Sequence, residues 1–302
     1  MIRQLRPIPK VDFSEIIGDR HLVTVSVGSD LSPVVLSLPQ EPDYRTVTPS
    51  GASFAKTRAS QPNQFAIHYL VGDDWLRSDL QETTENFHCL QPLGQEHWLL
   101  VRGRADGETD KNATVVYMDG RPQWSFHAGD GIEDVQASEK GEVWVSYFDE
   151  GVFGDSSMGQ AGLVCLDQHG NAILRYNDGV GSPYISDCYA LNVCSGKEVW
   201  LYYYTDFPLV QLLDYRLAGT WQNLPVAGSH SFAVGHDRVL FCGGYNKRDR
   251  LFLVALQSMT VTEIELLDRL GQPLREFRGI GRRSVLHIAT AETLYRLDVD
   301  EL

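Results

Sequence analysis

Five titratable side chains recur near one position of a repeated sequence pattern. His88, Asp134, His230 and Glu276 each lie ten residues before the central residue of a short apolar run, and a small insertion brings Asp187 near the same level. Imidazoles and carboxylates that converge on the mouth of one channel can bind a cation or polarise a substrate. Polar residues at the start of a strand can instead bond to neighbouring backbone or hold channel water. The sequence therefore leaves two interpretations open for these residues, an axial ligand-binding cluster and a structural role.

The apolar runs that these residues precede are themselves repeated. Residues 141–148 read GEVWVSYF and residues 197–204 read KEVWLYYY, and five further runs resemble them. The centres of the seven runs are Val23, Ala66, Trp98, Trp144, Trp200, Leu240 and Leu286. Their mean spacing is about 44 residues, and each run is accompanied by a preceding strand and a following hairpin pattern. A repeat of four short strands at this period is typical of propeller blades.

The pattern predicts an all-β fold, a single closed β-propeller domain over residues 1–302. A thin four-stranded sheet has two apolar faces and buries them only against its neighbours, which explains the repetition. Seven runs predict seven four-stranded blades, and the N-terminal residues 1–9 are expected to supply the fourth strand of the last blade. The short gap of 32 residues between Ala66 and Trp98 leaves an alternative of six, in which the first two runs share one blade.

Residues 128–153, GDGIEDVQASEKGEVWVSYFDEGVFG, resemble a motif of bacterial β-propellers of unassigned function. At the level of pattern the resemblance covers almost the whole chain. It implies the propeller architecture and carries over no catalytic residue.

Propellers present their ligand-binding loops on one face, and residues 148–160 are the longest insertion expected there. Aromatic and acidic residues in these loops can form a rim that binds a partner; calcium coordination by the acidic loop and a merely solvated loop are the alternatives. The expected rim residues are Phe148, Asp149, Glu150, Phe153, Tyr204, Asp206, Phe207 and Tyr245.

Composition narrows the classes of function. The formal net charge of −14 disfavours binding to nucleic acid and to anionic membranes. Five cysteines without a CxxC pair indicate reduced thiols and a cytoplasmic protein. No nucleotide-binding, zinc-protease or nucleophile-elbow motif occurs, so no cofactor, metal ligand or catalytic residue is assigned.

The leading hypothesis is a non-enzymatic binding or scaffold module that uses one propeller face for a protein partner. The alternative is a hydrolase, a lyase or a binder of a small ligand such as a sugar or lactone at the axial channel, with a cation assisting.

Overall fold

The computed structural model describes residues 2–49, 51, 53–180 and 183–302. The chain divides into two compact units, and each is described by itself. Glu15–Gly179 forms the unit called N-terminal below, and Met1–Ser14 with Val180–Leu302 forms the C-terminal unit.

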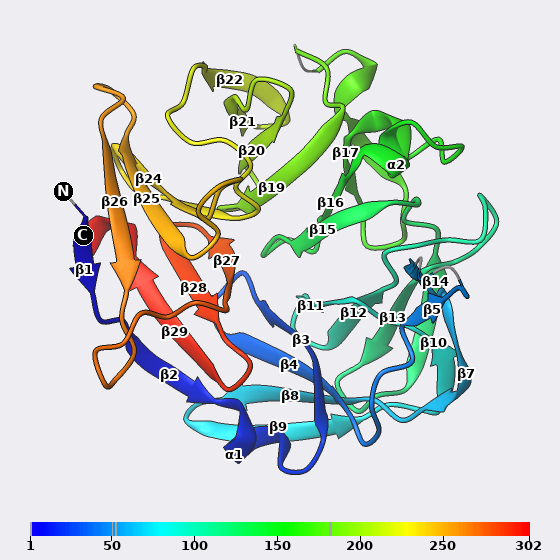
Figure 1. Ribbon diagram of the computed structural model, residues 1–302. Coiled ribbons are helices and arrows are strands. Elements are labelled where there is room, and N and C mark those ends of the chain that lie inside the picture. The colour runs from blue at the N-terminus through cyan, green and yellow to red at the C-terminus, as the bar shows by residue number, and fades with distance from the viewer. Residues whose placement is uncertain (1, 50, 52, 181–182) are drawn as a thin grey trace. The chain divides into compact units, whose positions relative to one another are not determined.

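The N-terminal unit contains three four-stranded antiparallel sheets (Figure 1). In sheet order these are β3 (His21–Val27), β4 (Pro33–Leu38), β8 (Ala66–Val71) and β9 (Asp74–Asp79); β11 (Cys89–Leu93), β12 (His97–Val101), β13 (Ala113–Tyr117) and β14 (Pro122–Phe126); and β15 (Ile132–Ala137), β16 (Val143–Tyr147), β17 (Leu163–Leu166) and β18 (Ala172–Arg175). Two small pairs are β5 (Arg45–Val47) with β6 (Ser53–Ala55), and β7 (Arg58–Asn63) with β10 (Thr83–Glu85). The short helical elements are α1 (Phe13–Ile17), which spans the boundary between the units, α2 (Asp149–Val152), η1 (Gly159–Ala161) and η2 (Tyr176–Asp178).

The C-terminal unit also contains three sheets. They are built from β19 (Asp187–Val193), β20 (Glu198–Tyr204), β21 (Leu209–Leu213) and β22 (Arg216–Trp221); from β23 (Phe232–Val234), β24 (Arg238–Cys242), β25 (Arg250–Ala255) and β26 (Val261–Leu266); and from β27 (Arg278–Arg282), β28 (Val285–Ala289) and β29 (Thr293–Asp298). The strand β2 (Ile8–Asp12) pairs antiparallel with β29 and completes the last sheet, whereas β1 (Arg3–Leu5) pairs parallel with β26. The turn η3 (Val299–Glu301) follows β29. The N-terminal segment therefore completes the last blade, as the sequence predicts, although its strand lies at residues 8–12.

These six sheets are the blades of a β-propeller, so the expected count of seven is wrong and the alternative of six is confirmed. The reason lies in the first blade. Val23 lies in β3 and Ala66 in β8, and both strands belong to one sheet. The intervening β5, β6 and β7 lengthen the chain between β4 and β8. In the sequence, β3 and β8 therefore look like the central strands of two separate blades.

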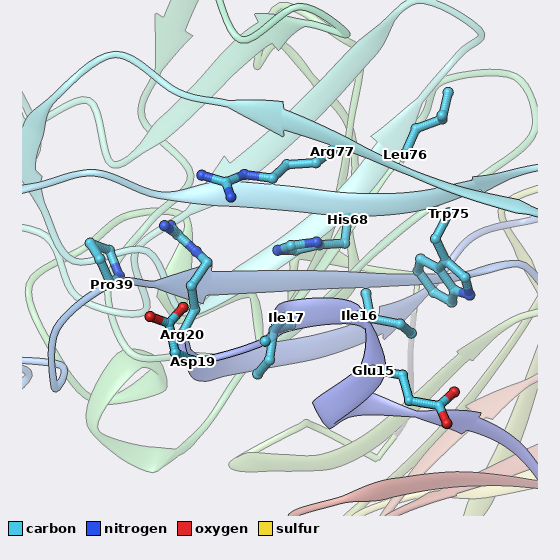
Figure 2. Close-up of a pocket in the computed structure, with 11 residues that line it drawn as sticks. Glu15, Ile16, Ile17, Asp19, Arg20, Pro39, His68, Trp75, Leu76 and Arg77 are labelled. Carbon is cyan, nitrogen blue, oxygen red and sulfur yellow. The ribbon is translucent and has the colours of Figure 1, made fainter.

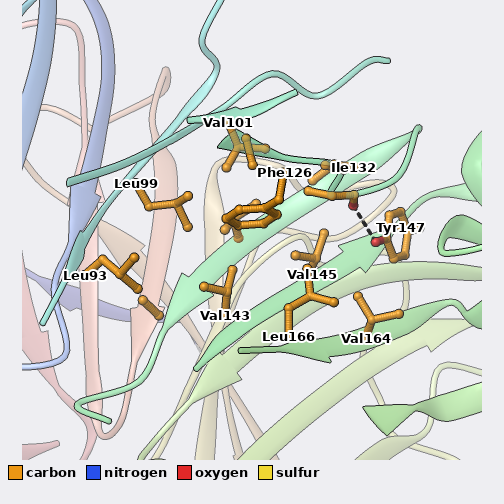
Figure 3. Close-up of a cluster of buried hydrophobic side chains, with 14 of the residues drawn as sticks. Leu93, Leu99, Val101, Phe126, Ile132, Val143, Val145, Tyr147, Val164 and Leu166 are labelled. Atoms are coloured by element: carbon orange, nitrogen blue, oxygen red, sulfur yellow. Dashed lines mark hydrogen bonds between the residues drawn. The ribbon is translucent and has the colours of Figure 1, made fainter. Parts of the chain in front are cut away.

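Packing between neighbouring blades explains the aromatic and branched residues of the repeated run. All five residues of β16 are buried, which fits a strand covered on both faces. Figure 3 shows Leu99 and Val101 of the preceding blade among the same buried cluster as Val143, Val145 and Tyr147. Full burial of each aliphatic side chain contributes roughly 1.5–3 kcal/mol. Tyr147 also donates a hydrogen bond of 2.6 Å from its hydroxyl to the carbonyl oxygen of Ala128, which satisfies its buried polar atom.

The first strands of the three C-terminal blades approach each other closely. A Cβ atom at Gly281 in β27 would lie 1.8 Å from the carbonyl oxygen of Phe232 in β23, so that position requires glycine. Asn192 of β19 is buried and donates from Nδ2 to the carbonyl oxygens of Phe232 and Arg283, at 3.0 Å each. Its Oδ1 accepts from the backbone nitrogen of Arg283 at 2.8 Å. These contacts hold β19, β23 and β27 together.

The described part of the chain includes no helix with the length and apolar character needed to cross a membrane.

Candidate functional site

Two of the five residues in the predicted ligand cluster lie in the N-terminal unit. His88 is half-buried before β11; its Nδ1 accepts from the backbone nitrogen of Gly103 at 3.2 Å, and burial lowers its pKa. Asp134 lies in β15, where Oδ1 accepts from the backbone nitrogen of Val135 at 2.8 Å and Oδ2 from Nε2 of Gln136 at 3.0 Å. Both side chains accept hydrogen bonds from neighbouring groups of the same unit.

The other three lie in the C-terminal unit. Asp187 begins β19, Glu276 is exposed in the loop before β27, and His230 is exposed before β23. The ring of His230 stacks on Tyr189, with centroids 4.7 Å apart. Because these residues belong to two separately described units, their convergence on one channel mouth stays a prediction.

The expected rim is likewise divided between the units. Asp149 and Glu150 lie in α2, and Phe148 and Phe153 flank it. The Arg104 guanidinium lies 5.8 Å from the centre of the Phe148 ring and pairs with Glu150 at 2.5 Å. Phe153 is 71% exposed. This half of the rim presents one exposed aromatic ring beside an ion pair.

The second half of the rim forms an aromatic cluster in the C-terminal unit. Tyr204, Asp206 and Tyr245 are exposed, whereas Phe207 is only 6% exposed and therefore supports its neighbours from below. Ring centroids of Phe207 lie 5.7 Å from Tyr204, 5.5 Å from Tyr245 and 5.1 Å from Tyr189. Tyr189 contacts both Phe207 and His230. The structure therefore brings one residue of the predicted ligand cluster next to the predicted rim.

A cavity of about 390 Å³ opens beside this cluster. It is called the tyrosine pocket below, and the lining residues used here are Tyr189, His230, Tyr245, Arg248, Phe277 and Arg278. They come from β19, from the loop before β23, from the loop between β24 and β25, and from the start of β27. Three blades of one unit thus contribute to it.

Local contacts fix the wall of the tyrosine pocket. The hydroxyl groups of Tyr189 and Tyr245 lie 2.8 Å apart, within hydrogen-bond distance. The backbone nitrogen of Tyr245 donates to the carbonyl oxygen of Ala227 at 3.1 Å, which joins two loops. Gly228 has a φ of +75°, and a Cβ there would lie 2.6 Å from the Tyr245 ring. Glycine is therefore required both for the turn and for the close approach of that ring.

The tyrosine pocket is locally basic in an acidic protein. Arg248 and Arg278 line it, and none of its lining residues in the described chain is Asp or Glu. Arg248 is exposed and forms no ion pair with the residues that the structure describes. The floor includes Cys242, and burial raises the pKa of this thiol to about 12. The thiol is protonated at neutral pH and is a poor nucleophile, so the arrangement suits binding rather than thiol catalysis.

A second cavity, of about 480 Å³, lies in the first blade of the N-terminal unit (Figure 2). The Arg20, His68 and Arg77 side chains extend along one side of it in Figure 2, whereas Trp75 lies at the other end. Arg20 donates from Nε to the Ser37 hydroxyl at 2.8 Å, and that hydroxyl is also 2.8 Å from Nε2 of His68. Burial, followed by the charges of Arg77 and Arg20, lowers the pKa of His68 to about 4.

The cations of this second cavity already have partners. Arg77 pairs with Asp79 at 2.5 Å, and Arg20 also donates to the carbonyl oxygen of Gln64 at 2.7 Å. Glu15 and Asp19 line the same cavity and offset the positive charge. The tyrosine pocket has no carboxylate among its lining residues, and its Arg248 forms no ion pair with the residues that the structure describes, so it is the better candidate for recognition of a charged ligand.

No group of three or more His, Cys, Asp or Glu side chains within the described residues is arranged to hold a metal ion.

Comparisons with known proteins bear on the fold. Residues 161–297 match the model of the YxzG family. No curated protein matches the chain. A gluconolactonase from Xanthomonas campestris is similar in structure, with a TM-score of 0.51, 10% identity, and coverage of 97% of this chain and 95% of that one. A virginiamycin B lyase from Staphylococcus aureus gives a TM-score of 0.49 at 8% identity over 95% of this chain and 97% of that one. YCF48 bound to D1 peptide gives 0.47 at 9% identity over 98% of each chain.

At this level of identity the gluconolactonase supports the propeller fold alone. The functional assignment must come from the residues of this chain.

Sequence reasoning missed Tyr189, Arg248 and Phe277 as parts of the site. Tyr189 is the third residue of β19 and reads as an ordinary strand residue. The other two could have been found from their positions in loops. Arg248 lies in the loop 244–250, and Phe277 lies in the segment 275–281, just before β27 begins. Their chemistry becomes visible only when the loops are placed side by side.

Proposed function

We propose that this protein is a binding module that holds an acidic, aromatic-containing segment of a protein partner in the tyrosine pocket. The observation that carries this proposal is the combination of stacked aromatic rings with two arginines and no acidic lining residue. Tyrosine and arginine are enriched among the residues that dominate binding energy at protein interfaces. Tyr204 and Tyr245 extend the aromatic surface beyond the cavity, since they are 42% and 50% exposed.

The charge distribution supports the acidic character of the segment. The chain as a whole carries −14, so an acidic partner is repelled by most of its surface and attracted at the pocket where the exposed Arg248 lies. Complementary charge of this kind sets the orientation and the association rate of a complex more than its affinity. The aromatic walls would supply most of the affinity.

Fluorescence anisotropy with a labelled Asp-Glu-Tyr-Glu-Asp peptide tests the proposal. We expect saturable binding that weakens as salt rises, because exposed charges are screened. Arg248→Glu should weaken it at least tenfold. Arg216→Glu, a charge reversal at an exposed arginine of β22 in the same unit, is the matched control and should change it less than twofold. Equal binding of a Lys-Lys-Tyr-Lys-Lys peptide would contradict the proposal.

A small-molecule function is the second candidate, because a cavity of 390 Å³ lies within the usual range of ligand sites. A sugar or lactone ligand, bound or hydrolysed beside His230, is its concrete form, and a gluconolactonase shares the fold. Release of acid from glucono-δ-lactone, followed by pH-stat above the spontaneous rate, distinguishes the two. A rate that disappears in His230→Ala favours the enzyme, and no rate above background favours the binding module.

We also propose that the protein works in a reducing compartment, the cytoplasm. All five cysteines are free thiols, and Cys165, Cys188 and Cys242 are buried. Free thiols are usual where glutathione and thioredoxin prevent disulfide formation. Titration with a thiol reagent under denaturing, non-reducing conditions should find five thiols in protein taken directly from its cells.

A further inference from the structure

A third cavity, of about 580 Å³, lies elsewhere in the C-terminal unit and is called the tryptophan pocket. The lining residues used here are Cys194, Glu198, Trp200, Gln211, Trp221 and Arg283. Cys194 follows β19, Arg283 lies in the turn between β27 and β28, and the others lie in β20, β21 and β22. None of these residues lines the tyrosine pocket.

Two tryptophans form one wall of the tryptophan pocket. The rings of Trp200 and Trp221 are stacked, with centroids 5.0 Å apart and an interplanar angle of 29°. Trp200 is 5% exposed, whereas Trp221 is half-buried and lines the cavity over the buried ring. A Cβ atom at Gly219 would lie 2.8 Å from the six-membered ring of Trp221, so glycine allows that ring to lie flat against its own strand. The result is a supported aromatic platform.

Polar groups of defined orientation surround the platform. Oε1 of Glu198 accepts from Nε1 of Trp200 at 2.9 Å and from Nε2 of Gln211 at 2.8 Å. These two bonds fix the carboxylate and leave Oε2 of Glu198 and Oε1 of Gln211 without a hydrogen bond to any residue that the structure describes. Both oxygen atoms are therefore available to accept from a ligand.

Arg283 supplies donors to the same cavity. Its Nε donates to the carbonyl oxygen of Cys194 at 3.0 Å, which anchors the side chain and leaves the two terminal nitrogens as donors. The residue has a φ of +54° in a two-residue turn, where glycine or asparagine is usual. An arginine at a backbone position that disfavours it indicates that the side chain itself is useful there.

The charge and the geometry decide the class of ligand. Glu198 and Arg283 are one anion and one cation, so the cavity has no excess charge that would select an ionic ligand. A hydroxyl group both donates and accepts, and it matches a wall that offers both acceptors and donors. A flat aromatic face next to such groups fits a ring with an apolar C–H face and polar edges. The geometry points to a binding site for a neutral pyranose sugar, in which the sugar ring packs on Trp221 and its hydroxyl groups bond to Glu198, Gln211 and Arg283.

Saturation-transfer NMR with methyl β-D-glucopyranoside, cellobiose, maltose and lactose tests this site on the full chain. We expect transfer to the ring protons of at least one of these sugars. In a titration of that sugar, Trp221→Ala should lower the affinity about tenfold. Glu198→Gln should lower it severalfold, because the charged acceptor is lost while the side-chain shape is kept. Trp75→Ala is the matched control: Trp75 is another half-buried tryptophan that lines a cavity, in the N-terminal unit, and its loss should change the affinity less than twofold.

Trp221→Phe guards against misfolding of the alanine variant, because it keeps an aromatic ring on Trp200 and should retain most of the binding. Absence of transfer to all four sugars overturns the inference, as does an equal loss in Trp75→Ala. Binding of the acidic peptide to the tyrosine pocket should be unchanged in Trp221→Ala, so failure of the sugar site and failure of the proposed peptide site are distinguishable.

Discussion

The tyrosine pocket and the tryptophan pocket lie at opposite ends of the same first strands. Tyr189 is near the start of β19 and Cys194 follows its end. His230 precedes β23, whereas His236 lies beyond its end and lines the tryptophan pocket. Phe277 precedes β27, and Arg283 follows it. One pocket combines aromatic rings with two cations, and the other combines aromatic rings with balanced charge and fixed acceptors.

This difference arises although the strands between the pockets are the same. The first strands set how far the blades stand apart. Loops at one end line the tyrosine pocket, whereas turns together with residues of β20, β21 and β22 line the tryptophan pocket at the other end. A propeller blade can therefore carry two unrelated recognition sites, one at each end. Substitutions in the shared strands should affect both pockets, and substitutions in the turns should affect one.

The largest expected effect is at the shared strands. In Gly281→Ala the added Cβ meets the backbone oxygen of Phe232, which cannot move as a flexible side chain would. Overpacking of this kind costs about 3 kcal/mol. Urea unfolding should show the loss, and both the peptide and the sugar should bind more weakly.

Gly103→Ala is the matched control for that experiment. A Cβ atom there would meet its nearest neighbour, the carbonyl oxygen of Ile132, at an ordinary 3.6 Å. The free energy of unfolding should stay within about 1 kcal/mol of the wild type. If folded Gly281→Ala protein bound either ligand with full affinity, the two pockets would not both depend on the packing of β19, β23 and β27.

The next effect is expected at Asn192, and it is unequal between the pockets. Asn192→Ala removes the bonds to the Phe232 carbonyl oxygen and to both backbone groups of Arg283, and leaves buried polar groups unpaired, at a cost of about 2–3 kcal/mol. Because Arg283 is the residue released, sugar binding should fall more than peptide binding. Asn192→Asp should destabilise further, since a carboxylate oxygen would then face two carbonyl oxygens. Equal losses of sugar affinity and peptide affinity would show that Asn192 acts only on the packing of β19, β23 and β27.

The repeated runs predict the blade and its strand order because burial on two faces leaves a strong apolar signal. They overcount the blades because Val23 and Ala66 belong to one enlarged sheet, and apolar pattern alone does not say which strands pair. The N-terminal closure of the last blade was predictable, because the last repeat supplies only three strands of its own and the N-terminal residues can add the fourth, as β2 does by pairing with β29.

The candidate sites were only partly predictable. His230 and Tyr245 were identified separately, but their common neighbour Tyr189 was not, because a tyrosine within a strand carries no mark of the face to which it points. The tryptophan pocket was not anticipated at all. It is formed by short hairpin turns, which sequence reasoning treats as connections, and by the contact of Trp200 with Trp221 across β21, which depends on strand register.

A third prediction concerns the pH dependence of the free energy of unfolding, which can be measured apart from ligand binding. His287 in β28 is 3% exposed, and burial together with the charge of Arg296 lowers its pKa to about 4. The unfolded chain, in which the pKa is near 6.5, takes up this proton first as pH falls. The contribution of the neutral His287 imidazole to the free energy of unfolding is therefore fully present above pH 6.5. It falls by about 2–3 kcal/mol as the pH drops from 6.5 to 4.

The unfolding free energy of His287→Gln, measured by urea titration at several pH values, should therefore vary less over that interval than that of the wild type. Identical slopes in the two proteins would contradict the burial of a neutral imidazole. Binding at the two pockets should be compared at pH 7 or above, where this contribution is constant.

The smallest effect is expected from Tyr245→Phe, which keeps the ring against Gly228 and removes only the hydroxyl bonded to Tyr189. A single neutral hydrogen bond contributes about 1 kcal/mol, and here both hydroxyl groups are near solvent, so the loss should be smaller still. Peptide affinity should fall less than fivefold, and sugar binding at the other end of the strands should not change. A loss as large as that in Arg248→Glu would mean that the hydroxyl pair itself contacts the partner, and the tyrosine pocket would then recognise hydrogen-bonding groups more than charge.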